Sequence, residues 1–299
     1  SIVLESKGVG VLKDTYNMSD LYHKMVTSLG ERFFTKVSKY TKENTQKKEL
    51  EEIFTNGAFD LDELRVLTYN AYNTFVKQDA LIFKGMHSKT DTQYPTLQSA
   101  INYVTGLHSI TIDKRPTMTD VYKYGLLKTE ELQQTNKDET NLKQQLFSYI
   151  HLTFQEYLTA YQIKESLKDS SKVRETCEFL ANNRDNPKYL MSLKFLSGLV
   201  SKDNSEDYNQ VTKAFWDSMT CNVDGVIDLG EDRKVELFMN LLGQVKKEDR
   251  DNIHEIVSKL RNSGEYIKEL QLEEFSNQNK VLELVNKVKS DLNIENSEL

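Results

Sequence analysis

The chain has 299 residues, a mass of 34.7 kDa, a formal net charge of −7 and a mean hydropathy of −0.60. This length corresponds to about two domains of ordinary size. Only three prolines and twelve glycines occur, and this scarcity of helix breakers favours a mainly α-helical protein. The acidic balance disfavours a general binder of nucleic acid or of an anionic membrane.

Two cysteines, Cys177 and Cys221, exclude a disulfide framework and a cysteine-rich zinc site, and they suit the cytoplasm. No stretch approaches the 18 or so consecutive apolar residues of a membrane span, and the first ten residues lack the pattern of a signal peptide. The chain begins without an initiator Met, so one expectation is that it belongs to a longer polypeptide.

Residues 1–54 form the first predicted region. Four apolar residues recur there at every fourth position: Leu21, Met25, Leu29 and Phe33. This spacing predicts a helix with one apolar face, capped by Ser19 or Asp20. The polar stretch 41–52 predicts a linker or an exposed helix.

The second predicted region, 55–165, begins with several short helices. Asp60 and Glu63 have the spacing of a capping box and precede a helical pattern. A strand-like segment follows at 80–83, and then a helix is predicted over 96–107. Another short helix begins at Pro116, with Thr119 as its expected cap and Gly125 as its end.

A predicted β-hairpin completes the second region. Residues 126–129 and 146–150 are strand candidates, and the tract between them is almost wholly polar, as at a hairpin tip. Short helices followed by a hairpin predict a winged-helix domain. The next helix is predicted from about Phe154, with Thr153 and Glu156 as a second capping box.

Residues 166–299 form the third predicted region, in which one helical pattern follows another. Each pattern carries one apolar face, which antiparallel pairs of helices in a HEAT-like superhelical arm would bury. Residues 221–299 hold seventeen acidic and eleven basic side chains, a balance of −6. An acidic helical arm predicts protein partners.

Motifs for catalysis or metal binding are weak. Residues 7–15 lack the spacing of a phosphate loop, and 220–231 resembles a calcium-binding loop but has Thr220 where the first ligand is normally Asp. No paired histidine motif or nucleophile elbow occurs, so we predict no metal site and no enzymatic activity. Both cysteines are expected to be core residues.

His151 is the candidate binding residue. It lies two residues before Thr153, near the positive end of a helix dipole, where an anion such as a phosphate is favoured. The alternative is that His151 is a buried structural residue.

The tract 147–163 reads H-x-x-F-Q-E-Y-x-x-A from His151 to Ala160, directly after an apolar strand. It resembles the motif that closes the winged-helix domain of NACHT-type NTPases of the STAND signalling class. Segments 21–33, 66–75, 122–128 and 186–201 have weaker similarity to other parts of that family. The resemblance implies that His151 contacts the β-phosphate of ADP when the NTPase core is present, and that core is absent from this chain.

The resemblance implies a non-catalytic regulatory, sensing and protein-interaction region, with no cofactor in this chain and ADP or ATP in the intact protein. Its partners would be proteins bound by the helical arm and the upstream NTPase domain, without nucleic acid or membrane. An alternative is a free-standing helical-repeat interaction protein or effector without a nucleotide switch. Winged-helix DNA binding is a third possibility, which the few cations of 60–78 disfavour.

Overall fold

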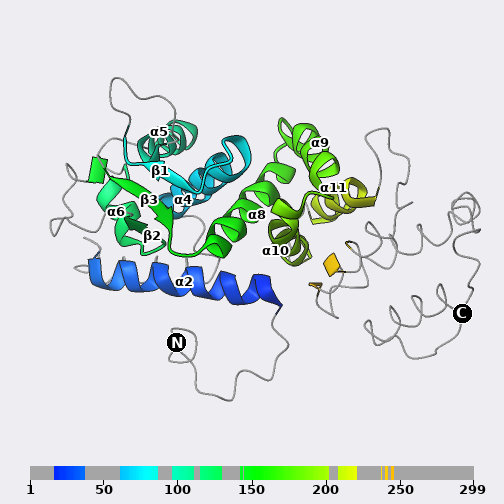
Figure 1. Cartoon of the computed structure of the whole chain (residues 1–299), viewed down its shortest axis with the longest axis horizontal. Helices are drawn as coiled ribbons and strands as arrows, with labels where there is room; N and C mark the ends of the chain where they lie inside the picture. The colour runs from blue at the N-terminus through cyan, green and yellow to red at the C-terminus, as the bar shows by residue number, and fades with distance from the viewer. Residues whose placement is uncertain are drawn as a thin grey trace, which may run out of the picture. The chain divides into compact units, whose positions relative to one another are not determined.

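The computed structural model describes residues 17–37, 61–86, 96–110, 115–129, 142–143, 145–201, 208–220, 237, 240–241 and 244–245. These residues are mainly helical, with one small sheet (Figure 1). The chain divides into two compact units, Ser1–Ile163 and Lys164–Leu299, and this boundary falls inside helix α8 (Leu152–Lys168). Within the described part of the chain, no helix has both the length and the apolar character needed to cross a membrane.

The first unit contains the helices and strands expected from the sequence. In chain order they are α2 (Met18–Val37), α4 (Asp62–Tyr72), the π-helical turn η4 (Asn73–Lys77), β1 (Ile82–Lys84), α5 (Leu97–Leu107), α6 (Met118–Lys123), β2 (Leu127–Thr129), β3 (Leu146–Tyr149) and most of α8. The predicted helix positions and the predicted hairpin strands are confirmed. The hairpin tip, 130–141, lies outside the described residues.

The three strands form one antiparallel sheet in the order β1-β3-β2. Phe147 of the central strand pairs with Phe83 on one side and Thr129 on the other. The rings of Phe83 and Phe147 are stacked with centroids 5.9 Å apart, and both side chains are fully buried. Helices α4, α5 and α6 contact one another and bury Leu64, Leu67, Leu97, Ile101 and Met118.

Two glycines are required by local geometry. A Cβ atom at Gly85 would lie 2.1 Å from the carbonyl oxygen of Leu142, while the Gly85 N–H donates to the Gln145 carbonyl at 3.0 Å. Gly125 has a φ of +94°, a conformation that favours glycine, and it ends the turn after α6 as the sequence predicts.

We expect Gly125→Ala to lower the free energy of unfolding by about 1–2 kcal/mol, because a Cβ atom disfavours positive φ. The matched substitution Gly106→Ala should raise it by about 0.5–1 kcal/mol, because Gly106 lies within α5 and a Cβ there meets no atom within 4 Å. Urea unfolding of both variants measures the two effects. If both substitutions changed the free energy of unfolding in the same direction, the positive φ of Gly125 would not explain the difference between the two glycines.

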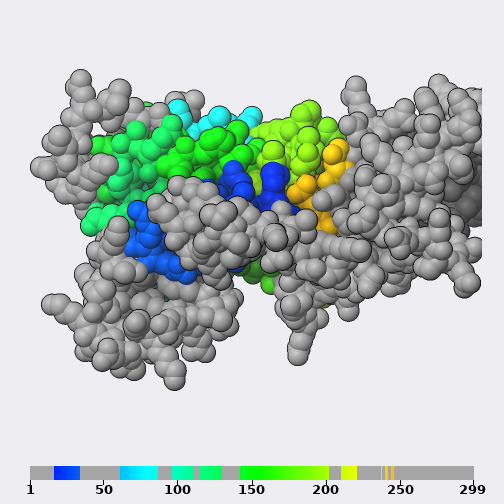
Figure 2. Space-filling model, turned by 90° about the horizontal axis from the view of Figure 1, so that it is seen from below, coloured from blue at the N-terminus to red at the C-terminus, as the bar shows by residue number. Residues whose placement is uncertain are grey.

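Helix α2 differs from the predicted helix in its buried face. Val26 and Phe33 are buried, whereas Leu21 is 40% exposed. The cap is also different, because the Asp20 N–H donates to Asn17 Oδ1 at 2.8 Å, so the prediction of Ser19 or Asp20 is wrong. The Tyr124 hydroxyl donates to the Val26 carbonyl at 3.2 Å, which holds α2 beside the residues that follow α6 (Figures 1 and 2).

Two other predicted caps are wrong. Helix α4 has Leu61 at its N-cap, with no hydrogen bond from a capping side chain, in place of Asp60. Helix α6 begins with a capping box formed by Thr117 and Asp120, in place of a cap at Thr119.

The second unit contains helices and turns, and no strand, among its described residues. After the end of α8 it contains α9 (Val173–Asn183), the 3₁₀ turn η6 (Pro187–Tyr189), α10 (Leu190–Val200) and α11 (Tyr208–Thr220). Helix α11 contacts α9 and α10. The rings of Phe215 and Trp216 lie edge to face with centroids 5.0 Å apart, and both are fully buried.

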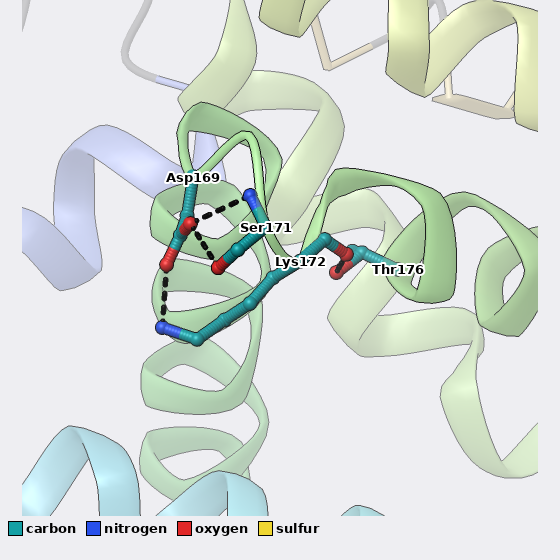
Figure 3. A network of polar contacts seen from close by, with 4 residues as sticks. All are labelled: Asp169, Ser171, Lys172 and Thr176. Atoms are coloured by element: carbon teal, nitrogen blue, oxygen red, sulfur yellow. Dashed lines mark hydrogen bonds and ion pairs between the residues drawn. The ribbon is translucent and has the colours of Figure 1, made fainter.

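A polar network holds the turn between α8 and α9 (Figure 3). The Asp169 carboxylate accepts bonds from the N–H and the hydroxyl of Ser171 and pairs with the Lys172 ammonium at 2.6 Å. These contacts lower the pKa of Asp169 to about 2. The hydrogen bond from Lys172 contributes most to this shift, and the bonds from Ser171 come next. The Thr176 hydroxyl donates to the Lys172 carbonyl, so the network continues into the first turn of α9.

Other sequence predictions for the second unit have mixed outcomes. Cys177 is half-buried rather than a full core residue, with its Sγ 3.9 Å from the Ala214 carbonyl. Pro187 opens the short 3₁₀ turn, and α10 follows it. Cys221, the loop at 220–231 beyond Thr220, and most of the later predicted helices lie outside the described residues.

Candidate functional site at the start of α8

His151 is exposed and stands directly before α8, in the turn that follows β3. Its Nδ1 atom accepts a hydrogen bond from the Thr153 backbone N–H at 3.3 Å and lies 2.7 Å from the Thr153 hydroxyl oxygen. The His151 carbonyl accepts a bond from the Phe154 N–H at 3.1 Å. The alternative of a buried His151 is therefore wrong, although its ring makes local hydrogen bonds to Thr153.

The hydrogen bonds at Nδ1 determine which ring nitrogen can donate. Because Nδ1 accepts from a backbone N–H, the neutral imidazole carries its proton on Nε2. The Tyr22 hydroxyl lies 2.5 Å from the Thr153 hydroxyl, which completes a chain from Tyr22 through Thr153 to the ring. Within the described ranges no group is seen to bond Nε2, so its N–H is available to an acceptor such as a phosphate oxygen.

The capping box predicted for Thr153 and Glu156 is wrong. Helix α8 begins at Leu152, so Thr153 lies inside its first turn, and the ring of His151 supplies the accepting atom. Glu156 is buried, and burial raises its carboxyl pKa. Glu156 and Phe154 thus both lie in the packed part of the helix.

Helix α2 supports the site from one side. The ring of Tyr22 lies edge to face against Phe154, with centroids 5.2 Å apart, and is also 5.9 Å from the ring of Tyr157. His23 Nδ1 lies 3.2 Å from the Tyr157 hydroxyl. These contacts hold the first turns of α8, and therefore His151, in a defined position.

Gln155 is a structural residue that sequence reasoning did not identify. Its Nε2 donates to the Thr74 hydroxyl at 2.9 Å and to the Ala80 carbonyl at 3.3 Å, and its side chain is 1% exposed. Thr74 lies in the π-helical turn η4 and donates in turn to the Asn70 carbonyl at 2.8 Å. These bonds from Gln155, which lies in the tract 147–163, connect α8 to the turn that follows α4.

We expect Thr153→Val to lower the free energy of unfolding by about 1 kcal/mol, because valine keeps the shape but loses the hydroxyl contacts to His151 and Tyr22. Thermal melts with Tyr22→Phe as the companion variant test this, since the double variant should cost little more than either single one. Fully additive losses would show that the three groups do not act as one chain.

The described ranges contain no group of three or more His, Cys, Asp or Glu side chains that could hold a metal ion. Two apolar side chains, Ile150 and Leu152, flank His151 with 42% and 43% exposure. The arrangement offers one neutral N–H donor beside apolar surface at the positive end of a helix. No family model, curated protein or solved structure matches this chain.

Proposed function

We propose that this chain is a non-catalytic regulatory and protein-interaction region of a NACHT-type STAND signalling NTPase. A winged helix over 55–165 would be followed by a HEAT-like arm over 166–299. The observation that carries the proposal is the exposed His151 after β3, with Nδ1 tied to Thr153 and Nε2 available to an anion. In the intact protein this N–H would donate to a phosphate of bound ADP.

The order of elements supports the winged-helix part of the proposal. From α4 to β3 the chain runs helix, strand, two helices, then two paired strands, with the last strand in the middle of the sheet. Winged-helix domains have this order. The short helix α6, which would enter a DNA groove in such a domain, carries Asp120 as well as Lys123, and this mixed charge disfavours DNA as its partner.

The arm would sense or scaffold a protein ligand. The winged helix would then transmit to the nucleotide pocket whether the arm has bound that ligand. Such a ligand acts only through different affinities for the closed and open forms. Support comes from the successive helices α9, α10 and α11, of which α11 packs against the other two through apolar residues.

The reading frame that precedes Ser1 is the first test. A phosphate loop upstream is the expected finding, and a frame without one would favour the free-standing interaction protein. In the longer protein, His151→Ala should accelerate ADP release by roughly ten- to a hundredfold, as for loss of one hydrogen bond to a charged group. His108→Ala, an exposed histidine after α5, is the matched control and should leave release unchanged.

The chain by itself supplies a second test. His151→Ala should lower its melting temperature by only a few degrees, because the exposed imidazole contributes the cap of α8, worth about 1 kcal/mol, and no buried contact. A drop of many degrees would assign His151 a structural role and remove the site from the proposal.

A further inference from the structure

Helices α4 and α5 pack side by side, and one tyrosine from each forms a stacked pair (Figure 1). The rings of Tyr69 and Tyr103 have centroids 3.9 Å apart and an angle of 10° between their planes. Aromatic pairs in proteins usually have centroids about 4.5–7 Å apart, so this contact is unusually close. The two residues stand more than thirty positions apart in the chain, and the pair therefore joins two separate helices.

The phenol ends of the two rings also lie near each other. Burial raises the pKa of Tyr69, and the charge of an ionised Tyr103 raises it further. Such an effect between two phenols requires their oxygen atoms to be within several ångströms of each other. The carbon atoms beside each hydroxyl, the ortho carbons, are therefore close to those of the other ring.

Tyr103 is accessible to small molecules from solvent. It is 40% exposed, whereas Tyr69 is half-buried. Gly106 lies one turn further along α5, next to Tyr103 on the helix surface, and a Cβ atom there would meet no atom within 4 Å. A small oxidant can therefore reach the phenol of Tyr103, and the ring has room to tilt.

We propose that Tyr69 and Tyr103 are a site of oxidative cross-linking, at which a one-electron oxidant joins the two rings as dityrosine. The oxidant is hydrogen peroxide acting through a haem peroxidase. Each phenol loses one electron and one proton, and together these reduce one peroxide to two waters. The two tyrosyl radicals then form a carbon–carbon bond between ortho carbons, and the hydrogen atoms on those carbons move to the phenol oxygens.

Proximity favours this pair over other tyrosines. Well-oriented groups in one molecule react as though at a concentration on the order of 10⁵ M or more, whereas phenols on separate molecules meet only by diffusion. Tyr22 and Tyr157 also contact each other, but their centroids are 5.9 Å apart, the angle between their planes is 36° and Tyr157 is fully buried. That pair meets the requirements for coupling less well. The inference does not depend on the proposed function.

Treatment of the full chain with a haem peroxidase and hydrogen peroxide tests the proposal. Wild type should become a monomeric species lighter by two hydrogen atoms, with dityrosine fluorescence and with the peptides of Tyr69 and Tyr103 linked in a protease digest. Because the new bond closes a loop between α4 and α5, the melting temperature should rise by several degrees. Tyr103→Phe keeps the stacked ring but lacks the phenol, so it should not form this link.

Tyr122→Phe is the matched control, since Tyr122 is half-buried as Tyr69 is, and its ring packs against Phe147 with centroids 5.9 Å apart. This control should form the link as wild type does. Tyr69→Phe is a second variant, on the other helix, and should behave as Tyr103→Phe does.

Two results would overturn the proposal. One is an oxidised wild type in which Tyr69 and Tyr103 are not linked, or in which the links lie mainly between separate molecules. The other is dityrosine at the wild-type yield in Tyr103→Phe and Tyr69→Phe, because the coupling would then occur at other tyrosines.

Discussion

Replacing Gln155 with leucine is expected to lower the free energy of unfolding by about 2–3 kcal/mol. Leucine has a similar volume, so the loss comes from the polar partners rather than from a cavity. The carbonyl of Ala80 and the hydroxyl of Thr74 would each lose the donor that Gln155 supplies. Unsatisfied polar groups in the interior carry their full desolvation cost.

Urea unfolding at constant pH measures this effect. The control is Gln98→Leu, another glutamine within a helix. Its amide donates to the exposed Asn102, and its replacement should cost less than about 0.5 kcal/mol. If the two substitutions cost the same, the bonds from Gln155 to the π-helical turn contribute nothing to stability.

Glu63→Gln is expected to stabilise the protein by about 2 kcal/mol at pH 8 and to leave it nearly unchanged at pH 4. Burial in the first turn of α4 raises the pKa of Glu63 from 4.5 to about 7, and Asp120 and Asp62 add to the rise. The unfolded chain therefore ionises this carboxyl at lower pH than the folded protein does. Stability is retained below pH 4.5 and lost as the pH rises towards 7.

The size of the effect follows from the pKa shift. A rise from 4.5 to about 7 corresponds to about 3 kcal/mol, and we expect less because Glu63 is only half-buried. Urea unfolding at several pH values should show a flatter profile for the glutamine variant. Glu178→Gln removes an exposed ion pair with Arg174 and should change stability by less than about 0.5 kcal/mol at any pH. Parallel profiles for wild type and Glu63→Gln would contradict the assignment.

The helices and the hairpin could be predicted because their signals are local. The apolar spacing within 96–107 and 173–183, and the paired strand candidates around a polar tract, depend only on neighbouring residues. The buried face of α2 could not be predicted from the spacing of its apolar residues alone. Four residues advance a helix by more than one turn, so Leu21 and Phe33 lie about 120° apart around the axis. Only Phe33 of this pair is buried.

The caps failed for a different reason. Each predicted helix start offers several Ser, Thr, Asp or Asn residues within a few positions, and propensity alone does not choose between them. Thr117 and Thr119 illustrate this, since both precede the same apolar residues and only Thr117 has Asp120 at the required spacing. At α8 the cap is a histidine ring, which the usual capping pattern does not include.

The candidate site could be predicted only in part. The place of His151 directly before a helix was predicted, whereas the role of Gln155 was not. Its partners Thr74 and Ala80 are more than seventy positions away in the chain, and no local pattern links them. The π-helical turn that presents Thr74 has no sequence signature that we could have used.

The chain has one tryptophan, and Trp216 is fully buried in the second unit. Tryptophan emission therefore reports the unfolding of that unit alone, whereas the far-ultraviolet signal comes from helices of both units. If the two probes give one transition, the units unfold together; if they separate, each unit has a stability of its own. A single fluorophore that the sequence already contains thus makes the cooperativity of the two units measurable without a label.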